Sequence, residues 1–289
     1  MTNPQTGAEP KPLAQGTKQV TEGMTGASSL MGKSIVDARG QALAQIHDVI
    51  VDSQGGLTAV VELPGTPGFT GIPLSKLSPM VVQTPAGAAP TGTQPTAAPV
   101  NDATVAVDHF VFSGNIAQLQ KAPVLNDVST VDDQWLTQVD QTFGVPANHV
   151  TSTAGEPVRR PIGLQELLRR RVASVGGEGL GNVKDVGVSL RDSRAAFLVF
   201  GGQVAGQADP VFHGVALDSF HFEDPQNVLI DTDRAALARS KGVDLARMPS
   251  KPSFALPPGP KVIRTPGNGT APADKPGGAG ASKPDSGPK

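Results

Sequence analysis

The sequence of 289 residues contains no cysteine and no tyrosine, and it has only one tryptophan. The absence of cysteine excludes disulfides, thiolate metal ligands and cysteine nucleophiles. It does not indicate whether the protein occupies an oxidising or a reducing compartment, because a chain without thiols is compatible with both. Aromatic residues make up only 4% of the chain, which argues against a surface that stacks nucleic-acid bases.

A strong charge of one sign is also lacking. The formal net charge is -2 at pH 7 and the pI is about 6.2, so no overall field attracts nucleic acid or an anionic membrane. No stretch approaches the roughly 18 apolar residues that span a bilayer, and residues 1–28 lack the pattern of a secretory signal. We therefore expect no transmembrane segment and a cytoplasmic location, or a periplasmic one if a signal peptide has been removed.

Both ends of the chain are polar and rich in Pro and Gly, so we expect them to be disordered. Residues 84–99 consist only of Thr, Pro, Ala, Gly and Gln, and they indicate a flexible loop inside a domain. The predicted division is a disordered N-terminal segment (1–28), a first domain (29–145), a linker (146–163), a second domain (164–250) and a disordered tail (251–289).

An internal repeat is the strongest pattern that is present. At an offset of 137 residues, apolar, glycine and aspartate positions coincide, and the register continues through "TAVVEL" (58–63) against "AAFLVF" (195–200). Beyond a loop it resumes at an offset of 143, with "GIPLSKL" (71–77) against "GVALDSF" (214–220). The coincident pairs are Leu30/Leu167, Ile35/Val172, Gly40/Gly177, Leu43/Leu180, Ile46/Val183, Asp48/Asp185, Val49/Val186 and Val51/Val188.

Each copy contains apolar runs of strand length that are separated by turn residues, a pattern that favours a small closed barrel. Short helices are expected after each barrel. The first copy has "SGNIAQLQK", with Ser113 as N-cap, and a helix capped by Thr130 that ends at Gly144; the second copy has a helix over 232–242.

The order of the motifs resembles the PRC-barrel domain family, which includes the H subunit of the photosynthetic reaction centre and a ribosome maturation factor. The matching motifs in the first copy are "LMGKSIVDARG", "IHDVIVDSQGG", "TAVVEL" and "GIPLSKL". The second copy matches more loosely, with Arg169 in place of Gly32, and it keeps Gly181 where the first copy has Ala44. The resemblance implies a mainly β fold of two small PRC-type β-barrels in tandem, with protein partners in larger assemblies.

Four positions that the repeats share are interpreted as structural. Asp48 and Asp185 are expected to accept hydrogen bonds from the backbone N–H groups of a neighbouring turn, because no second acid or His recurs beside both. Gly40 and Gly177 are expected to supply a left-handed turn conformation.

The histidines do not form a convincing site. His213 and His221 flank Asp218, but metal ligands usually lie closer together, and neither histidine recurs in the first copy. No nucleophile, base and orienting group stand together. We expect no catalytic residue, no metal and no cofactor.

A basic cluster precedes the second domain and is the candidate interaction surface. It suits phosphates and carboxylates alike, and a solvated domain junction, an acidic protein partner and RNA or lipid phosphate are all open. The cluster consists of Arg159, Arg160, Arg169, Arg170 and Arg171.

These observations predict a non-enzymatic protein–protein interaction or adaptor module, because a small barrel fills its interior with its own side chains. Two tethered barrels would gain avidity on one partner protein. The alternatives are an RNA- or ribosome-associated protein that uses the basic cluster, and an envelope-associated structural protein.

Overall fold

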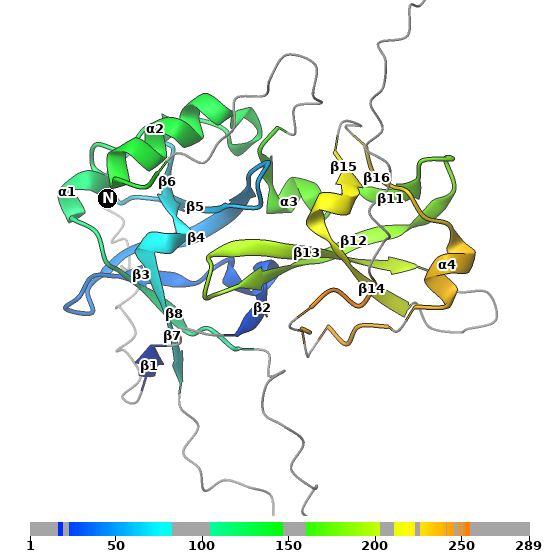
Figure 1. Ribbon diagram of the computed structural model, residues 1–289. Coiled ribbons are helices and arrows are strands. Elements are labelled where there is room, and N and C mark those ends of the chain that lie inside the picture. Colours follow the sequence, from blue (N-terminus) through cyan, green and yellow to red (C-terminus); the bar gives the residue numbers. More distant parts are fainter. Residues whose placement is uncertain are drawn as a thin grey trace, which may run out of the picture. The chain divides into compact units, whose positions relative to one another are not determined.

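The computed structural model describes residues 17–19, 23–82, 105–146, 160–202, 211–222, 226–240, 242–245, 248–249 and 251–254. Within these ranges the protein is mainly β, as the sequence predicts, and short helices accompany two curled sheets (Figure 1). None of the described helices has the length and apolarity needed to cross a membrane.

The first sheet is formed largely by residues of the first repeat. Its strands follow one another, by hydrogen-bonded neighbours, in the order β1 (Thr17–Gln19), β7 (Leu77–Val82), β8 (His109–Phe112), β3 (Ser34–Val36), β4 (Ala42–Val51), β5 (Leu57–Glu62), β6 (Phe69–Pro73) and β9 (Val124–Leu125). One further strand, β10 (Ile162–Gly163), also pairs with β4 although it comes from the start of the second repeat. Its residues lie in the segment that was predicted to be a linker.

The second sheet is formed largely by residues of the second repeat. Its strands follow the order β14 (Val211–Ala216), β13 (Arg194–Gly202), β12 (Gly179–Ser189), β11 (Arg171–Ser174), β16 (Asn227–Ile230) and β15 (Phe220–His221). Here the additional strand is β2 (Met24–Gly26), which pairs with β12 and comes from the start of the first repeat.

The two sheets share one organisation. In each, a long strand (β4 or β12) is antiparallel to the strands before and after it, and β3 and β11 each gain a parallel neighbour, β8 and β16. Equivalent bulges interrupt the pairing, between Ile46 and Asp48 in β4 and between Val183 and Asp185 in β12. Strand order and the bulge before each aspartate therefore repeat at the predicted offset of 137 residues.

The predicted register of β5 with respect to β13 is wrong by two residues, because Val60 lies opposite Asp48 whereas Val199, at an offset of 139, lies opposite Asp185. The second sheet has a further bulge between Gly187 and Val188, which contributes to this shift.

The curl of each sheet follows from a short connection. β6 and β7 lie far apart in the strand order, yet only the 3-10 turn η2 (Leu74–Lys76) joins them. The turn η5 (Leu217–Ser219) joins β14 and β15 in the same way. Three residues reach from one strand to the other only if the sheet bends round. Large side chains such as Phe110, Phe200 and Phe220 are fully buried as a result.

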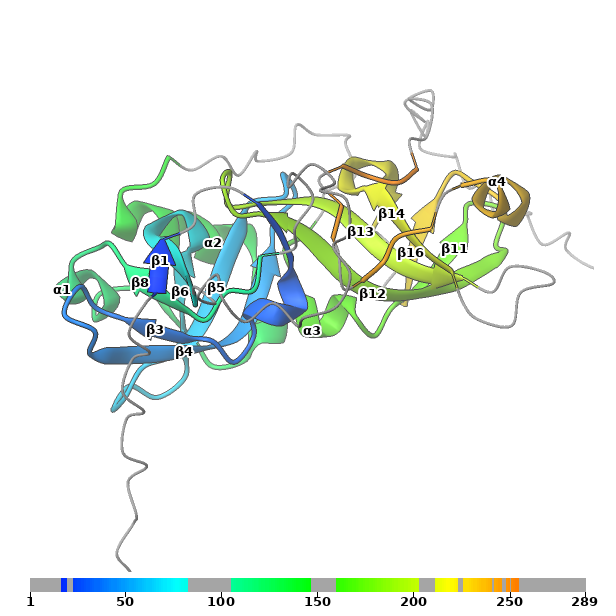
Figure 2. The ribbon, with the colours of Figure 1, turned by 90° about the horizontal axis from the view of Figure 1, so that it is seen from below.

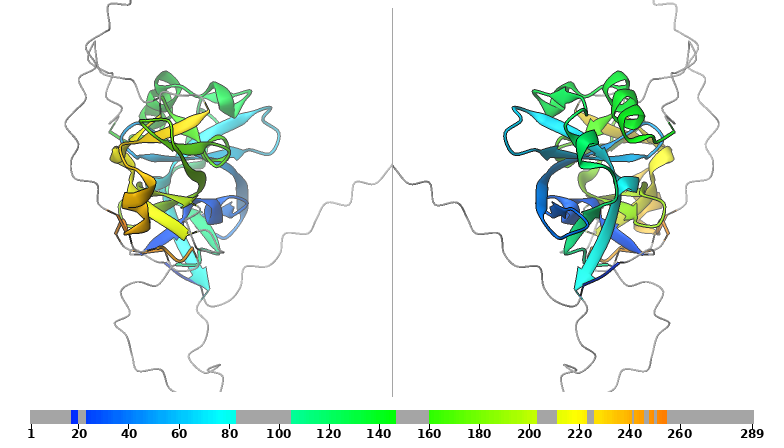
Figure 3. Two further views of the ribbon diagram at one scale, coloured as in Figure 1. Left: turned by 90° about the vertical axis from the view of Figure 1, so that its right-hand side faces the viewer. Right: turned by 90° about the vertical axis from the view of Figure 1, so that its left-hand side faces the viewer.

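The helix α2 (Asp133–Phe143) confirms the predicted apolar stripe, since Trp135, Val139 and Phe143 are all buried. It packs against β6 of the first sheet (Figures 1 and 3). Gly144 ends the helix in the left-handed conformation, with φ of 62°, as predicted.

The predicted N-caps of two helices are wrong by two residues. Asp132 caps α2 by accepting a hydrogen bond from the N–H of Trp135 at 2.7 Å, because its carboxylate stands immediately before the first turn. The hydroxyl of Thr130 instead donates to the carbonyl of Asp127. Likewise, α1 (Ile116–Leu119) is capped by Asn115 rather than by Ser113. The last helix, α4 (Arg234–Ala238), lies within the predicted range.

Part of the segment that was predicted to be disordered forms regular structure. Residues 17–19 form β1, which pairs with β7. Residues 24–28 form β2 and the start of the 3-10 turn η1 (Ala27–Leu30). Their apolar side chains are too few to fold alone, but another part of the chain buries them. Met24 packs with Phe197 and Met248, and Ala27 is fully buried.

Several predicted segments lie outside the described residues. They are residues 1–16 and 20–22 of the N-terminal segment, the loop at 84–99, residues 147–159 of the linker and residues 255–289 of the tail. At the start of the predicted tail, the N–H of Phe254 donates to the carbonyl of Gly214 at 3.1 Å.

We predict that Gly181→Ala destabilises the protein far more than Gly179→Ala. Gly181 has φ of +144°, and a Cβ atom there would overlap the carbonyl oxygen of Gly201 on β13, whereas Gly179 faces open space. The first change should lower the free energy of unfolding by about 2 kcal/mol or more, and the control should change it by less than about 1 kcal/mol. Equal urea-denaturation midpoints for the two variants would contradict this reading.

Candidate functional site

Each repeat places its first segment on the sheet of the other repeat. The segment 24–30 (β2 and η1) lies along β12, and the segment 162–167 (β10 and α3, Leu164–Leu167) lies along β4 (Figure 2). We call these the exchanged segments and the surfaces that hold them the β12 seat and the β4 seat. The opposed residues are Met24–Ser189, Thr25–Val188 and Gly26–Gly187 at the β12 seat, and Ile162–Val51 and Gly163–Ile50 at the β4 seat.

At the β4 seat, the buried carboxylate of Asp48 binds the exchanged segment through a hydrogen bond. Its Oδ1 accepts the N–H of Val49 at 2.8 Å and the N–H of Gln165 at 3.2 Å. Gln165 also donates from Nε2 to the carbonyl of His47 at 3.0 Å. The bulge in β4 turns the aspartate toward the exchanged segment. The same carboxylate oxygen of Asp48 therefore accepts one N–H from the adjacent residue, Val49, and one from the distant residue Gln165.

At the β12 seat, Asp185 binds the other exchanged segment in the same manner. Its Oδ1 accepts the N–H of Val186 at 2.7 Å and the N–H of Ser28 at 3.0 Å. The Ser28 hydroxyl also donates to Oδ2 at 2.6 Å. Burial raises the pKa of both Asp48 and Asp185 above the ordinary value of 3.8, and the hydrogen bonds oppose this rise only in part.

The two carboxylates thus accept backbone N–H groups from turns, the role that the sequence predicts, but each turn comes from the other repeat. A glycine lets each segment approach, because a Cβ atom at Gly26 or Gly163 would collide with the facing carboxylate. Sequence reasoning missed Gly26, Ser28, Gly163 and Gln165. The signal was available, since the offset of 137 residues that aligns the aspartates also aligns Gly26 with Gly163 and Ser28 with Gln165.

The other predicted structural glycines lie in tight turns. Gly40 has φ of 81° and Gly177 has φ of 88°, which is the left-handed conformation that was expected. The N–H of Gly40 donates to the carbonyl of Asp37, and that of Gly177 donates to the carbonyl of Ser174.

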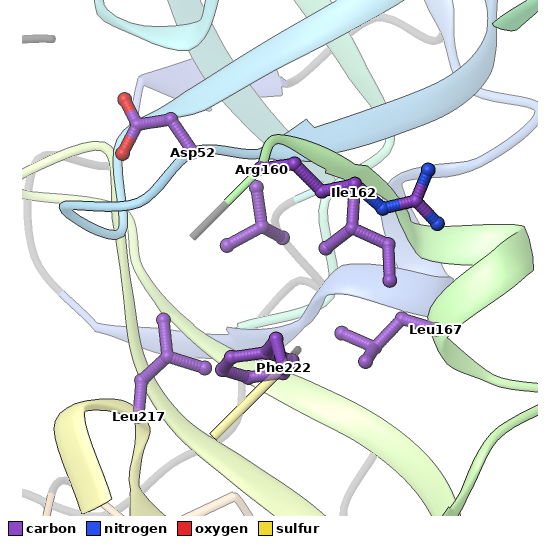
Figure 4. Close-up of a pocket in the computed structure, with 7 residues that line it drawn as sticks. Asp52, Arg160, Ile162, Leu167, Leu217 and Phe222 are labelled. Carbon is purple, nitrogen blue, oxygen red and sulfur yellow. The ribbon is translucent and has the colours of Figure 1, made fainter. Parts of the chain in front are cut away.

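A small apolar cavity lies beside the β4 seat (Figure 4). Its volume of about 10 Å³ is close to that of a single water probe. The charged ends of Asp52 and Arg160 point away from Leu217 and Phe222 in the close-up. The lining residues are Val51, Asp52, Arg160, Ile162, Leu167, Leu217 and Phe222. This hollow has neither the size nor the polar groups of a substrate site.

The basic cluster does not form one surface. Arg170 is only 3% exposed, and its Nη2 lies 2.6 Å from Oε1 of Glu166. Its Nη1 also donates to the carbonyl of Phe222 at 3.4 Å. Arg160, which is exposed, pairs with the same Glu166 oxygen at 2.7 Å. Two of the five arginines are therefore engaged with one carboxylate of an exchanged segment.

The remaining arginines have different settings. Arg169 and Arg171 are exposed on either side of the buried Arg170. Arg159 lies outside the described residues. Exposed and buried positions alternate here as successive side chains do along a strand. β11 begins at Arg171, and because the next residue, Val172, points into the core, Arg171 points outward.

The histidines are dispersed in the same way. His213 is buried, its Nδ1 lies 2.7 Å from Oγ of Ser240, and burial lowers its pKa. His47 is exposed and stacks on Phe69. Within the described residues, no three acidic or histidine side chains gather as a metal site would require. His149 lies outside those residues.

The fold and the site define a mainly β protein in which two equivalent curled sheets exchange their first segments. No protein-family model matches this chain, and no curated protein matches it either. The resemblance to PRC-barrel proteins consequently depends on the sequence motifs and their order.

We predict that replacing both buried aspartates by asparagine changes the pH dependence of stability. Because the folded pKa values of Asp48 and Asp185 are raised, the folded state binds protons more tightly than the unfolded state. The free energy of unfolding should therefore fall as the pH rises from 3.8 through the folded pKa values. Asp48→Asn with Asp185→Asn should remove this fall, as measured by urea denaturation between pH 4 and 8.

The matched control for the asparagine variant is Asp37→Asn, whose carboxylate caps an exposed turn. The double variant should depart from the wild-type pH profile more than this control does. A double variant whose profile is parallel to that of the wild type would show that the two buried carboxylates do not titrate as described.

We predict that Arg170→Ala destabilises the fold, whereas Arg169→Ala and Arg171→Ala do not. The first change removes the buried partner of Glu166 and should lower the free energy of unfolding by about 1.5–3 kcal/mol. The two exposed positions should change it by less than about 0.5 kcal/mol. Indistinguishable thermal melts for all three variants would contradict a stabilising role of the buried Arg170 and its ion pair with Glu166.

Proposed function

We propose that the chain is a non-enzymatic protein–protein interaction or adaptor module in which two sheets of PRC-barrel type act as one unit. The observation that carries the proposal is the reciprocal exchange at the β4 and β12 seats. Segments bound in this way couple the two sheets more tightly than a flexible tether would. A single partner protein would then meet both sheets in a fixed relation.

The packing supports recognition on the outside of the molecule. One continuous hydrophobic cluster includes buried residues of both sheets and of both exchanged segments. The interior of each sheet is thus occupied by side chains of the protein itself, and partner contacts are left to the outer faces.

The protein's own chain also lies along the outer side of β6 in the first sheet and of β14 in the second. β9 pairs with the outer side of β6. At β14, the N–H groups of Val243 and Phe254 donate to the carbonyls of Phe212 and Gly214. Strand addition by a partner is therefore disfavoured at these positions, and side-chain contacts on the outer faces are the mode that we propose.

The RNA-binding alternative has a narrower basis than the sequence suggests. Of the described arginines in the basic cluster, only Arg169 and Arg171 are not engaged with Glu166, and two charges give a modest phosphate contact. The other alternative, an envelope-associated structural protein, requires that the protein is secreted, and the geometry of the exchanged segments does not bear on it.

The proposal is tested by photo-crosslinking in the full chain, at one exposed apolar position of each sheet. A photoreactive side chain is placed at Val124 in β9 or at Val175 between β11 and β12, which are 46% and 50% exposed. We expect both positions to capture the same partner protein. A control variant with the probe at the buried Leu136 should capture none.

Two results would overturn the adaptor function. One is the absence of any shared protein adduct although both variants keep the wild-type unfolding midpoint. The other is recovery of RNA that is lost on raising the salt concentration and lost in the Arg169→Ala, Arg171→Ala variant, which would establish the RNA-binding alternative instead.

A further inference from the structure

The β4 seat lies directly beside the start of its own repeat. The N–H of Gly32 donates to the carbonyl of Ile46 at 2.8 Å, and the N–H of Ile46 donates to the carbonyl of Lys33 at 2.9 Å. Asp48, which binds the segment at this seat, is only two residues further along β4. The segment that precedes Gly32 would therefore reach this seat without a longer connection. In the structure, however, the seat holds the segment of the other repeat.

The second repeat keeps one of these two hydrogen bonds. The N–H of Val183 donates to the carbonyl of Arg170 at 3.1 Å, and Asp185 follows two residues later. Three residues, 31–33, connect η1 to β3, and three residues, 168–170, connect α3 to β11. The two connections are equal in length, so length alone does not decide which segment occupies which seat.

The side chains that enter the seats are different. The residue after the shared glycine is Ala27 at the β12 seat and Leu164 at the β4 seat, and both are fully buried. The next residue also differs, since Ser28 donates its hydroxyl to Asp185 whereas Gln165 reaches the carbonyl of His47. Each seat is thus matched to the segment that it holds.

We propose that the two seats are selective segment-binding sites, each of which takes the segment of the opposite repeat and rejects that of its own. The discriminating contact is the size of the side chain after the glycine. Ala27 in the β4 seat would leave a cavity where Leu164 now packs, and Leu164 in the β12 seat would overpack the space that Ala27 fills. The repeats are thereby specific partners for one another, independently of the adaptor function.

The absence of cysteine from the chain allows a direct test by disulfide trapping. In the full chain, Thr25→Cys with Val188→Cys reports the exchanged arrangement, because these residues face each other across the β2–β12 pair. Thr25→Cys with Val51→Cys reports the own-repeat arrangement, since Val51 occupies the equivalent place on β4. After refolding under oxidising conditions, we expect the first pair to form at least tenfold more intrachain disulfide than the second.

The selectivity is tested by exchanging the two side chains. Ala27→Leu with Leu164→Ala in the same chain gives each seat a better match to the segment of its own repeat. We expect the disulfide yields to invert, so that Cys substitutions at Thr25 and Val51 trap more than those at Thr25 and Val188. A folded double variant that still traps only the exchanged pair would overturn the role of residues 27 and 164.

Two further measurements keep the proposal testable if the double variant does not fold. With the natural residues at 27 and 164, Ile162→Cys should pair with Val51→Cys and not with Val188→Cys, and equal yields would overturn the selectivity. Chains that carry only Thr25→Cys are also refolded together with chains that carry only Val188→Cys. A crosslinked dimer as the main product would place the exchange between two chains, and would overturn its assignment to one.

Discussion

Two buried carboxylates, those of Asp48 and Asp185, hold together parts of the chain that are more than a hundred residues apart. A charged group removed from water is tolerated only when hydrogen-bond donors surround it. Here one donor comes from the next residue of the same bulged strand, and another comes from the first turn of the opposite repeat. Neither carboxylate is satisfied until both repeats are in place, so the two sheets are coupled in folding.

This coupling changes how the duplication is understood. Two domains on a linker would move independently and would bind a partner through avidity. Two sheets that complete each other share one hydrophobic core, which is why we propose that they meet a partner as a unit. The inner faces of the two sheets are buried against the protein's own side chains. We therefore assign the proposed recognition of a partner protein to the outer faces.

The arginines show how a cluster in the sequence separates in three dimensions. Arg170 lies between two exposed neighbours, because the chain turns there from α3 into β11. It is buried and pairs with Glu166, so it supports the fold and contributes little to a binding surface. Consecutive like charges therefore overstated the positive surface that a nucleic acid would meet.

The mainly β fold, the duplication, the buried stripe of α2 and the structural role of the two aspartates all followed from the sequence. Each depends on local chemistry: turn residues, alternation of apolar side chains, and residues that recur at a constant spacing. The helix caps were misplaced because Ser113, Asn115, Thr130 and Asp132 all have capping chemistry, and only the backbone path selects among them. The exchange of segments was decided by the tertiary structure. Each segment has a connection of the same length to its own sheet, and the choice between the seats is made by packing between residues that the sequence places far apart.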